Sequence, residues 1–155
     1  MASVEITKVK DGITLSIDAM ITRGKSVSSF LNRATYPVYQ QLQIQRWETE
    51  NASENESWNP VKPDYATIKR KRYAGFPGGG QKLMVATSKL AFAAQGLAGA
   101  LKIVTESSMT VGIDQGFIPY AKYPGADRPY MSFSDDSISK MTDPLVQYIM
   151  NGTGL

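Results

Sequence analysis

The residues best suited to catalysis lie near the carboxyl end of the sequence. Ser137 and Lys140 fit the Ser-x-x-Lys pattern, in which a lysine activates a serine nucleophile. The adjacent Asp135 and Asp136 could hold a hard cation through carboxylate oxygens. Patterns of such common residue types arise often by chance, and aspartates at a helix start also satisfy free N–H groups and complement the helix dipole. Structural roles are therefore the better interpretation of both patterns.

Two glycine-containing stretches resemble parts of a phosphate-binding loop. Gly24-Lys25-Ser26 matches the tail of the Walker pattern, but Ala19 stands where its first glycine is required. The second stretch, 74–81, is followed by lysine, but Gln81 separates that lysine from the last glycine. We interpret the first as a helix cap at Ser26 and the second as a flexible connector.

Two absences from the composition bear on catalysis. The sequence has no histidine and no cysteine. The commonest general base, the thiol nucleophile and the thiolate metal sites are therefore missing, and Ser-His-Asp and Cys-His chemistry is excluded. We expect a protein that is not an enzyme and that holds no cofactor and no metal.

The densest positive charge lies in one short segment, formed by Lys69, Arg70, Lys71 and Arg72. These four residues could contact the phosphates of nucleic acid or an acidic partner. Two other readings stay open. Such a run is usually a solvated helix face, and upstream glutamates could pair with it across a subunit contact; they are Glu48, Glu50, Glu54 and Glu56.

The bulk properties are those of one ordinary globular domain over residues 1–155. Hydrophobic residues make up 42% of the chain and charged residues 20%. The net charge of +3 is too small to indicate a dedicated nucleic-acid binder by itself. No apolar run reaches the ~20 residues of a membrane helix, and the first residues lack the apolar core of a secretory signal. We expect a soluble, intracellularly made protein with no membrane contact.

The periodicity of apolar residues predicts an α+β fold, in which helices pack on an antiparallel sheet. A first hairpin is expected from Val4 to Ile17 around Asp11-Gly12, and a second from Leu101 to Ile113. A long helix is expected over Ser26–Glu48, bent near Pro37. Further helices are expected over 64–73, over 83–94 with Gly96 as the C′ residue, and from Ser134 to about Ile149, with Pro144 kinking or restarting the last.

Polar loops are expected between these elements, at about 48–65 and 74–81. Trp58 is the one large apolar group of the first loop and is expected to anchor it on the core. The segment 120–136 is expected to be a strap rather than a catalytic loop. In this reading Tyr120 and Tyr130 anchor the strap, and Arg128 bonds to backbone carbonyls or to a neighbouring subunit.

An ordered series of short motifs runs through most of the chain, from about Gln40 to Met150. Trp-x-Pro precedes a short basic helix, and a Leu-x-x-x-Thr-Ser-x-Leu segment follows it. A strand ending in Val-Gly then leads to Tyr-Ala, a glycine, Arg-Pro-Tyr and a last helix that opens with Ser-x-Asp. The residues that carry the series are Trp58, Pro60, Thr87, Leu90, Val111, Gly112, Tyr120, Gly125, Arg128, Pro129 and Ser134.

This order resembles the tailed-phage virion morphogenesis or tail-completion family, the Mu-type neck proteins. The resemblance implies a structural virion protein at the head–tail junction, forming a ring of identical subunits around the DNA channel. Its expected partners are further copies of itself and the neighbouring connector and tail proteins, with possible non-specific contact to DNA. Its expected location is the virion, after assembly in the bacterial cytoplasm. A tail terminator that caps the tail tube and a small nucleic-acid-binding domain using Lys69–Arg72 remain alternatives.

Overall fold

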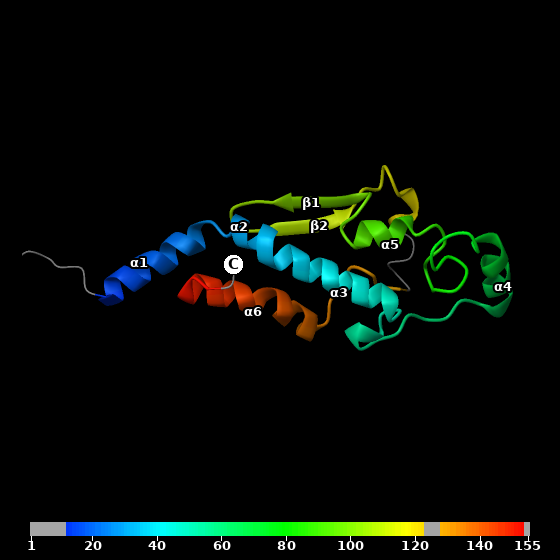
Figure 1. The fold of residues 1–155 in the computed structure, drawn as a ribbon, viewed down its shortest axis with the longest axis horizontal. Coiled ribbons are helices and arrows are strands. Elements are labelled where there is room, and N and C mark those ends of the chain that lie inside the picture. Colours follow the sequence, from blue (N-terminus) through cyan, green and yellow to red (C-terminus); the bar gives the residue numbers. More distant parts are fainter. Residues whose placement is uncertain (1–11, 123–127, 154–155) are drawn as a thin grey trace, which may run out of the picture.

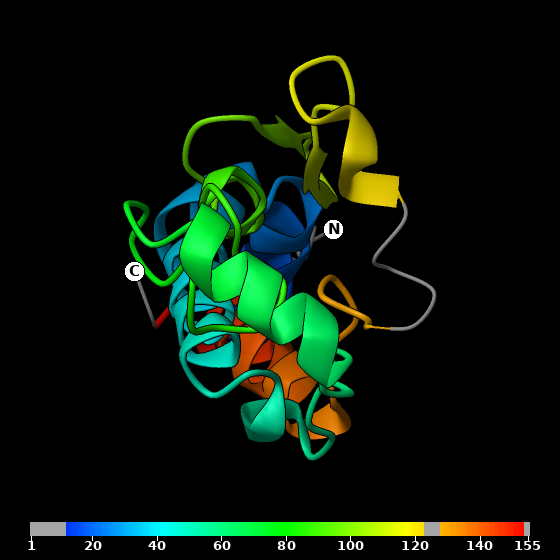
Figure 2. The ribbon, with the colours of Figure 1, turned by 90° about the vertical axis from the view of Figure 1, so that its right-hand side faces the viewer.

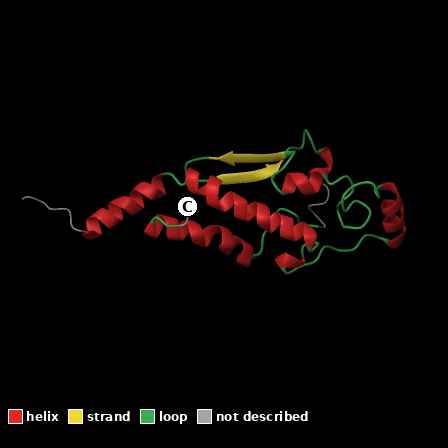
Figure 3. Ribbon diagram, in the orientation of Figure 1, coloured by secondary structure: helices red, strands yellow, loops and turns green. Residues whose placement is uncertain are grey.

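The computed structural model describes residues 12–122 and 128–153. The chain forms an α+β fold that combines helices with one antiparallel hairpin, as Figure 1 and Figure 3 show. No helix in the described ranges is long and apolar enough to cross a membrane. The elements in order are α1 (Gly12–Lys25), α2 (Ser28–Phe30), a π-helical turn (Leu31–Thr35), α3 (Tyr36–Glu48), α4 (Pro63–Arg72), α5 (Lys89–Ala94), β1 (Ala100–Val104), β2 (Met109–Ile113) and α6 (Asp135–Asn151), with 3-10 turns at Ala52–Glu54 and Pro119–Lys122.

Helix α3 forms the middle of a layered arrangement. The β1–β2 hairpin lies along one side of it and α6 along the other, in both Figure 1 and Figure 2. Helix α1 continues away from the amino end of α2 and packs on α6. Helix α4 lies at the opposite end of the molecule, beside the glycine-rich turns. The β1–β2 hairpin and α6 therefore lie on opposite sides of α3.

The expected first hairpin is wrong from Gly12 onward, because residues 12–25 form helix α1. Its first half, before Gly12, lies outside the described residues. Helix α1 is held by α6: the Arg23 guanidinium donates to the Ile149 and Met150 carbonyls, at 2.9 Å each. These carbonyls belong to the last turn of α6, which has no intrahelical donors for them. Tertiary contact thus decides between helix and strand in a short alternating segment whose pattern fits both.

The expected long helix is confirmed nearly to its bounds, and its irregularity falls where proline predicts one. The expected cap at Ser26 is wrong, because the helix begins at Ser28 after Val27, with no side-chain cap bond. The Tyr36 N–H donates to the Leu31 carbonyl, one residue beyond the α-helical partner. Pro37 has no N–H and would crowd the carbonyl four residues before it, so a wider turn relieves the clash. The extra residue also shifts the buried face. Thr35 and Tyr39 are buried, whereas Ala34 and Val38 of the expected stripe are only half-buried.

The expected helix over 83–94 is shorter in the structure, because α5 begins only at Lys89. Met84 and Ser88 adopt left-handed backbone conformations, with φ of 54° and 65°, which a continuous helix excludes. The stretch 74–81 folds into successive turns beside α4. Gly79 is buried there, and a Cβ atom on it would lie 2.3 Å from the Ala86 carbonyl oxygen, so only glycine fits. Gly96, with φ of 79°, ends α5 as expected.

The second hairpin and the last helix are confirmed. Strands β1 and β2 pair in antiparallel register from Ala100↔Ile113 to Val104↔Met109. Ser134 caps α6, since its side chain accepts a hydrogen bond from the Ser137 N–H. The helix then continues through Pro144 without a break. The core cluster combines side chains from α3, the 50–62 loop, α5 with the residues just before it, and the segments that follow the hairpin. It includes Trp47, Trp58, Val85, Leu90, Ile118 and Tyr130.

Candidate functional site

Two segments of the motif series, 58–60 and 128–130, meet in a clasp between the first polar loop and the strap. The Trp58 Nε1–H donates to the Pro129 carbonyl at 2.8 Å. The Arg128 guanidinium donates to the Asn59 carbonyl at 2.9 Å and to the Pro60 carbonyl at 3.4 Å. Trp58 itself is buried in the core, as expected of an anchor. Arg128 therefore bonds to backbone carbonyls of its own chain, and this clasp fixes two loops that are about 70 residues apart in sequence.

The two tyrosines of the strap differ in their surroundings. Tyr130 is buried against Trp47, and its hydroxyl donates to the Ala121 carbonyl. Tyr120 is 44% exposed and is not part of the core cluster. The expected anchoring role is therefore met by Tyr130, whereas Tyr120 stands at the surface. Gly125 lies outside the described residues.

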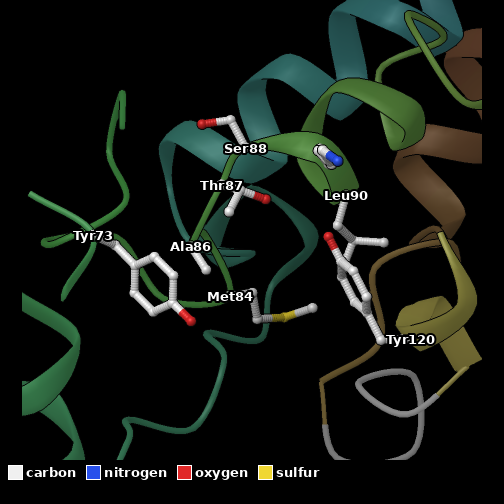
Figure 4. A pocket seen from close by; sticks show the side chains of 8 residues that line it. Tyr73, Met84, Ala86, Thr87, Ser88, Leu90 and Tyr120 are labelled. Carbon is white, nitrogen blue, oxygen red and sulfur yellow. The ribbon is translucent and has the colours of Figure 1, made fainter. Parts of the chain in front are cut away.

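Tyr120 borders a cavity of about 260 Å³ that brings together three residues of the motif series. Thr87 and Leu90 line it from the start of α5, and Tyr73 and Met84 complete its walls. Figure 4 shows the two tyrosine rings on opposite sides of the opening, with Met84 between them. The lining holds hydroxyls, methyl groups, one thioether and the side chain of Lys89, but no carboxylate. Most of this surface suits an apolar or aromatic group.

A buried ion pair, which the sequence pattern did not indicate, joins three parts of the chain. Arg46 on α3 is fully buried, and its Nη2 lies 3.5 Å from Oε2 of Glu54. The Glu54 carboxylate also accepts the Ser134 N–H at 2.8 Å and the Ser137 hydroxyl at 2.9 Å. The guanidinium lies 4.5 Å from the centre of the Phe133 ring. The only sequence signal is that Arg46 falls on the buried side of a long helix, beside Trp47.

Burial and the neighbouring groups act in opposite directions on the pKa values of Glu54 and Arg46. Burial, the largest single influence, opposes ionisation of Glu54, but the bonds from Ser134 and Ser137 together with Arg46 outweigh it and hold the pKa of Glu54 below its usual range. Burial lowers the pKa of Arg46, and Glu54 counteracts that effect. Arg46 and Glu54 bind each other, and the Glu54 carboxylate also binds Ser134 and Ser137 at the start of α6. We therefore interpret the cluster as structural.

The serine and aspartate patterns near the carboxyl end are occupied by structural contacts. The Ser137 hydroxyl donates to Glu54, and the Lys140 ammonium pairs with Asp136 at 2.6 Å, one turn earlier on α6. Asp135 and Asp136 occupy the first turn of α6 after the Ser134 cap. Within the described ranges, no group of three or more histidine, cysteine or acidic side chains could hold a metal ion.

The basic cluster is divided by the structure. Arg70, Lys71 and Arg72 are exposed on α4, while Lys69 is buried and its ammonium donates to the Lys82 carbonyl. Two of the four upstream glutamates have partners in their own chain: Glu50 accepts the Leu83 N–H at 2.6 Å, and Glu54 pairs with Arg46. The four basic residues therefore differ in their exposure to solvent.

No family model, curated protein or solved structure matches the chain. Of the motif residues in the described ranges, Trp58, Pro60, Arg128 and Pro129 meet in the clasp, and Thr87, Leu90 and Tyr120 surround the cavity. Val111 and Gly112 lie on β2, and Ser134 caps α6.

Proposed function

We propose that the protein is a non-enzymatic structural virion protein of a tailed phage or prophage, acting at the head–tail junction as a ring of subunits around the DNA channel. The ordered motif series supports the family. The observation that carries the proposal is the presence of two separate apolar surfaces on opposite sides of one chain, which is what a ring of identical subunits requires. The protein would become part of the virion during assembly in the bacterial cytoplasm.

The first surface, here called the hairpin face, is the outer side of β1. Leu101 and Ile103 point away from α3 and are 48% and 61% exposed. The intervening Lys102 turns to the other side, where its ammonium lies 4.1 Å from the centre of the Tyr36 ring. Among the described residues, no third strand lies beside this two-stranded sheet, and exposed apolar side chains on such a sheet are typical of a contact surface.

The second surface, here called the α6 stripe, follows one side of the last helix. Val146 and Met150 are four residues apart, are 53% and 54% exposed, and lie on one face of the helix. Ile138 is 44% exposed, and it points within about 20° of the direction of the half-buried Leu145 and Ile149, so it borders this face. Helix α6, which carries the stripe, lies on the other side of α3 from the β1–β2 hairpin (Figure 1 and Figure 2).

These positions favour head-to-tail contact over a two-fold dimer. A two-fold dimer through either surface leaves the other exposed on both subunits, whereas head-to-tail contact covers both on every subunit of a closed ring. Contact between the hairpin face of one copy and the α6 stripe of the next follows from this geometry.

Two single substitutions test the ring, with oligomer mass measured by sedimentation or mass photometry. Ile103→Asp and Val146→Asp should each abolish rings, because either one places a charge in the same joint. Mixing the two variants should restore heterodimers, since each keeps the surface that the other lost. Gln41→Asp, at an exposed position of α3 in neither surface, is the control and should leave rings intact. Rings that survive one of the two substitutions would contradict head-to-tail assembly.

The place of the protein in the virion is tested by electron microscopy of particles made without it. Unjoined heads and tails are expected for a neck protein, whereas tails of abnormal length would indicate the alternative role of tail terminator. Normal virions would contradict both roles. Binding of the purified protein to isolated heads or isolated tails separates its partners, the connector and tail proteins.

A second candidate function is a small nucleic-acid-binding domain, favoured by the exposure of Arg70, Lys71 and Arg72 on one short helix. Such binding should weaken steeply with salt. Replacing the three residues by glutamine should flatten the dependence of the binding constant on salt concentration, and an unchanged slope would count against this candidate.

A further inference from the structure

Behind the exposed cations of α4 lies a hollow of about 440 Å³, between this helix and the glycine-rich turns. Its volume falls in the range of about 300–1,000 Å³ that is usual for small-molecule sites. None of the residues that line it is acidic; they are Val61, Ala66, Lys69, Arg70, Gly80, Gln81 and Leu83.

The feature that gives this hollow a chemistry is Lys69. Its side chain reaches the hollow, although the residue is only 5% exposed. The ammonium donates one hydrogen bond, to the Lys82 carbonyl, and within the described ranges no carboxylate lies within ion-pair distance of it. Glu50 is near, but its carboxylate accepts the Leu83 N–H. A buried cation with donors to spare is costly unless something negative compensates it.

The other polar side chains of the lining can also donate hydrogen bonds. Arg70 contributes a guanidinium and Gln81 an amide. Gly80 lies against the backbone of α4, and its N–H makes no hydrogen bond in the part of the chain that the structure describes. Burial of the ammonium lowers the pKa of Lys69, and the nearby negative charge of Glu50 offsets only part of this effect.

We propose that this hollow is a binding site for a phosphate group, with the backbone of a nucleic acid as its source. A tetrahedral oxyanion can accept bonds from an ammonium, a guanidinium and a backbone N–H at once, and guanidinium matches phosphate in a bidentate manner. The exposed Lys71 and Arg72 continue the positive charge beyond the hollow, as a polyanion would require.

The site differs from the Walker loop that the glycines superficially resemble. In that loop the lysine directly after the glycines binds the phosphates. Here Lys82 turns away, and its ammonium donates to the Trp47 carbonyl at 3.4 Å. The cation that faces the hollow comes instead from α4. All lining residues belong to one chain, so the site stands whether or not the protein assembles into rings.

Isothermal titration with inorganic phosphate at constant ionic strength tests the site. Lys69→Met should weaken phosphate binding at least about tenfold, because a charge-assisted hydrogen bond is lost. Lys71→Met removes the same charge two residues away, at an exposed position, and should change the affinity less than about twofold. A second measurement uses the unmodified chain: phosphate should slow the chemical acetylation of Lys69, followed by mass spectrometry, and leave that of Lys71 unchanged.

A short DNA duplex distinguishes the source of the phosphate. If nucleic acid is the source, the duplex should compete with inorganic phosphate and bind at least about tenfold more weakly to Lys69→Met than to Lys71→Met. Equal weakening by both variants would overturn nucleic acid as the source and leave free phosphate or a nucleotide. Absence of phosphate binding, equal binding by Lys69→Met, or Lys69-dependent binding of oligoglutamate without binding of phosphate would overturn the site itself.

Discussion

Replacement of Glu54 by glutamine is the sharpest test of how this fold is held together. The substitution keeps the size of the side chain but removes the charge opposite Arg46, whose guanidinium is fully buried. Breaking a buried pair by removing one partner costs about 3–5 kcal/mol. Glutamine retains an oxygen that can accept one bond from Ser134 or Ser137, so we expect a loss of about 3 kcal/mol, at the low end of that range.

The assay is urea unfolding followed by tryptophan fluorescence, since both tryptophans, Trp47 and Trp58, are buried in one cluster and their ring centres lie 5.0 Å apart. Asp136→Asn is the matched control, because it neutralises the acid of an exposed ion pair on α6. That change should cost no more than about 1 kcal/mol, from the pair and the helix dipole together. The comparison separates the buried charge from a general effect of removing an acid.

The difference in stability between the wild type and Glu54→Gln should depend on pH. The folded-state pKa of Glu54 is lower than the ordinary value, so its ionisation stabilises the native state above the pKa of the unfolded chain. This contribution is lost as the pH falls through the folded pKa. The wild-type protein should therefore exceed Glu54→Gln in stability at pH 7, and the difference should shrink toward about pH 3. A loss below about 1 kcal/mol at pH 7, or an equal loss at both pH values, would refute the reasoning.

Three further substitutions probe the backbone and the clasp. Gly96→Ala should lower the unfolding free energy by at least about 1 kcal/mol, because φ is 79° and a Cβ atom would lie 2.4 Å from the Tyr36 hydroxyl. Thermal melts measure the change. The control is Gly24→Ala, in open space on α1, which should be neutral or stabilising. Tyr39→Phe removes a buried hydroxyl that donates to the Ala94 carbonyl at 2.6 Å and should cost about 1 kcal/mol, and because burial raises the pKa of Tyr39, its loss should remove only the most alkaline step of a tyrosinate titration. Arg128→Lys keeps the positive charge but cannot make both guanidinium hydrogen bonds, to the Asn59 and Pro60 carbonyls, so proteolysis in the 50–62 loop should be faster. A proteolysis rate equal to that of the wild type would show that the clasp is dispensable.

Where local chemistry decides, the sequence was sufficient to predict the structure. Ser134 caps α6 through its own side chain, and Pro37 marks the irregular turn, because both effects act within one helical turn. The strap was likewise expected to bond to backbone through Arg128, although nothing in the sequence named Asn59 and Pro60 as the partners.

The remaining features depend on contacts between distant residues. Glu54 meets Ser134 across 80 positions, and no periodic pattern encodes such a meeting. The left-handed conformations at Met84 and Ser88 shorten α5, and neither residue type announces them. Lys69 and Arg70 are neighbours in a basic run, yet one is buried and the other exposed, because a helix turns successive side chains by about 100°. The alternating residues after Gly12 fit strand and helix alike, and contact with α6 selected the helix.

The π-helical turn at Leu31–Thr35, which leads into α3, contains one residue more than a regular α-helical turn. Its backbone bond spans five residues where an α-helix spans four, so losing one residue from the turn would restore the regular ladder and keep Phe30 and Tyr39 on the same face. Such a deletion is compatible with the fold only if Pro37 also changes, because the regular ladder has no room for its ring. Length and proline at this point are therefore tied: relatives one residue shorter here should carry a residue other than proline at the position of Pro37.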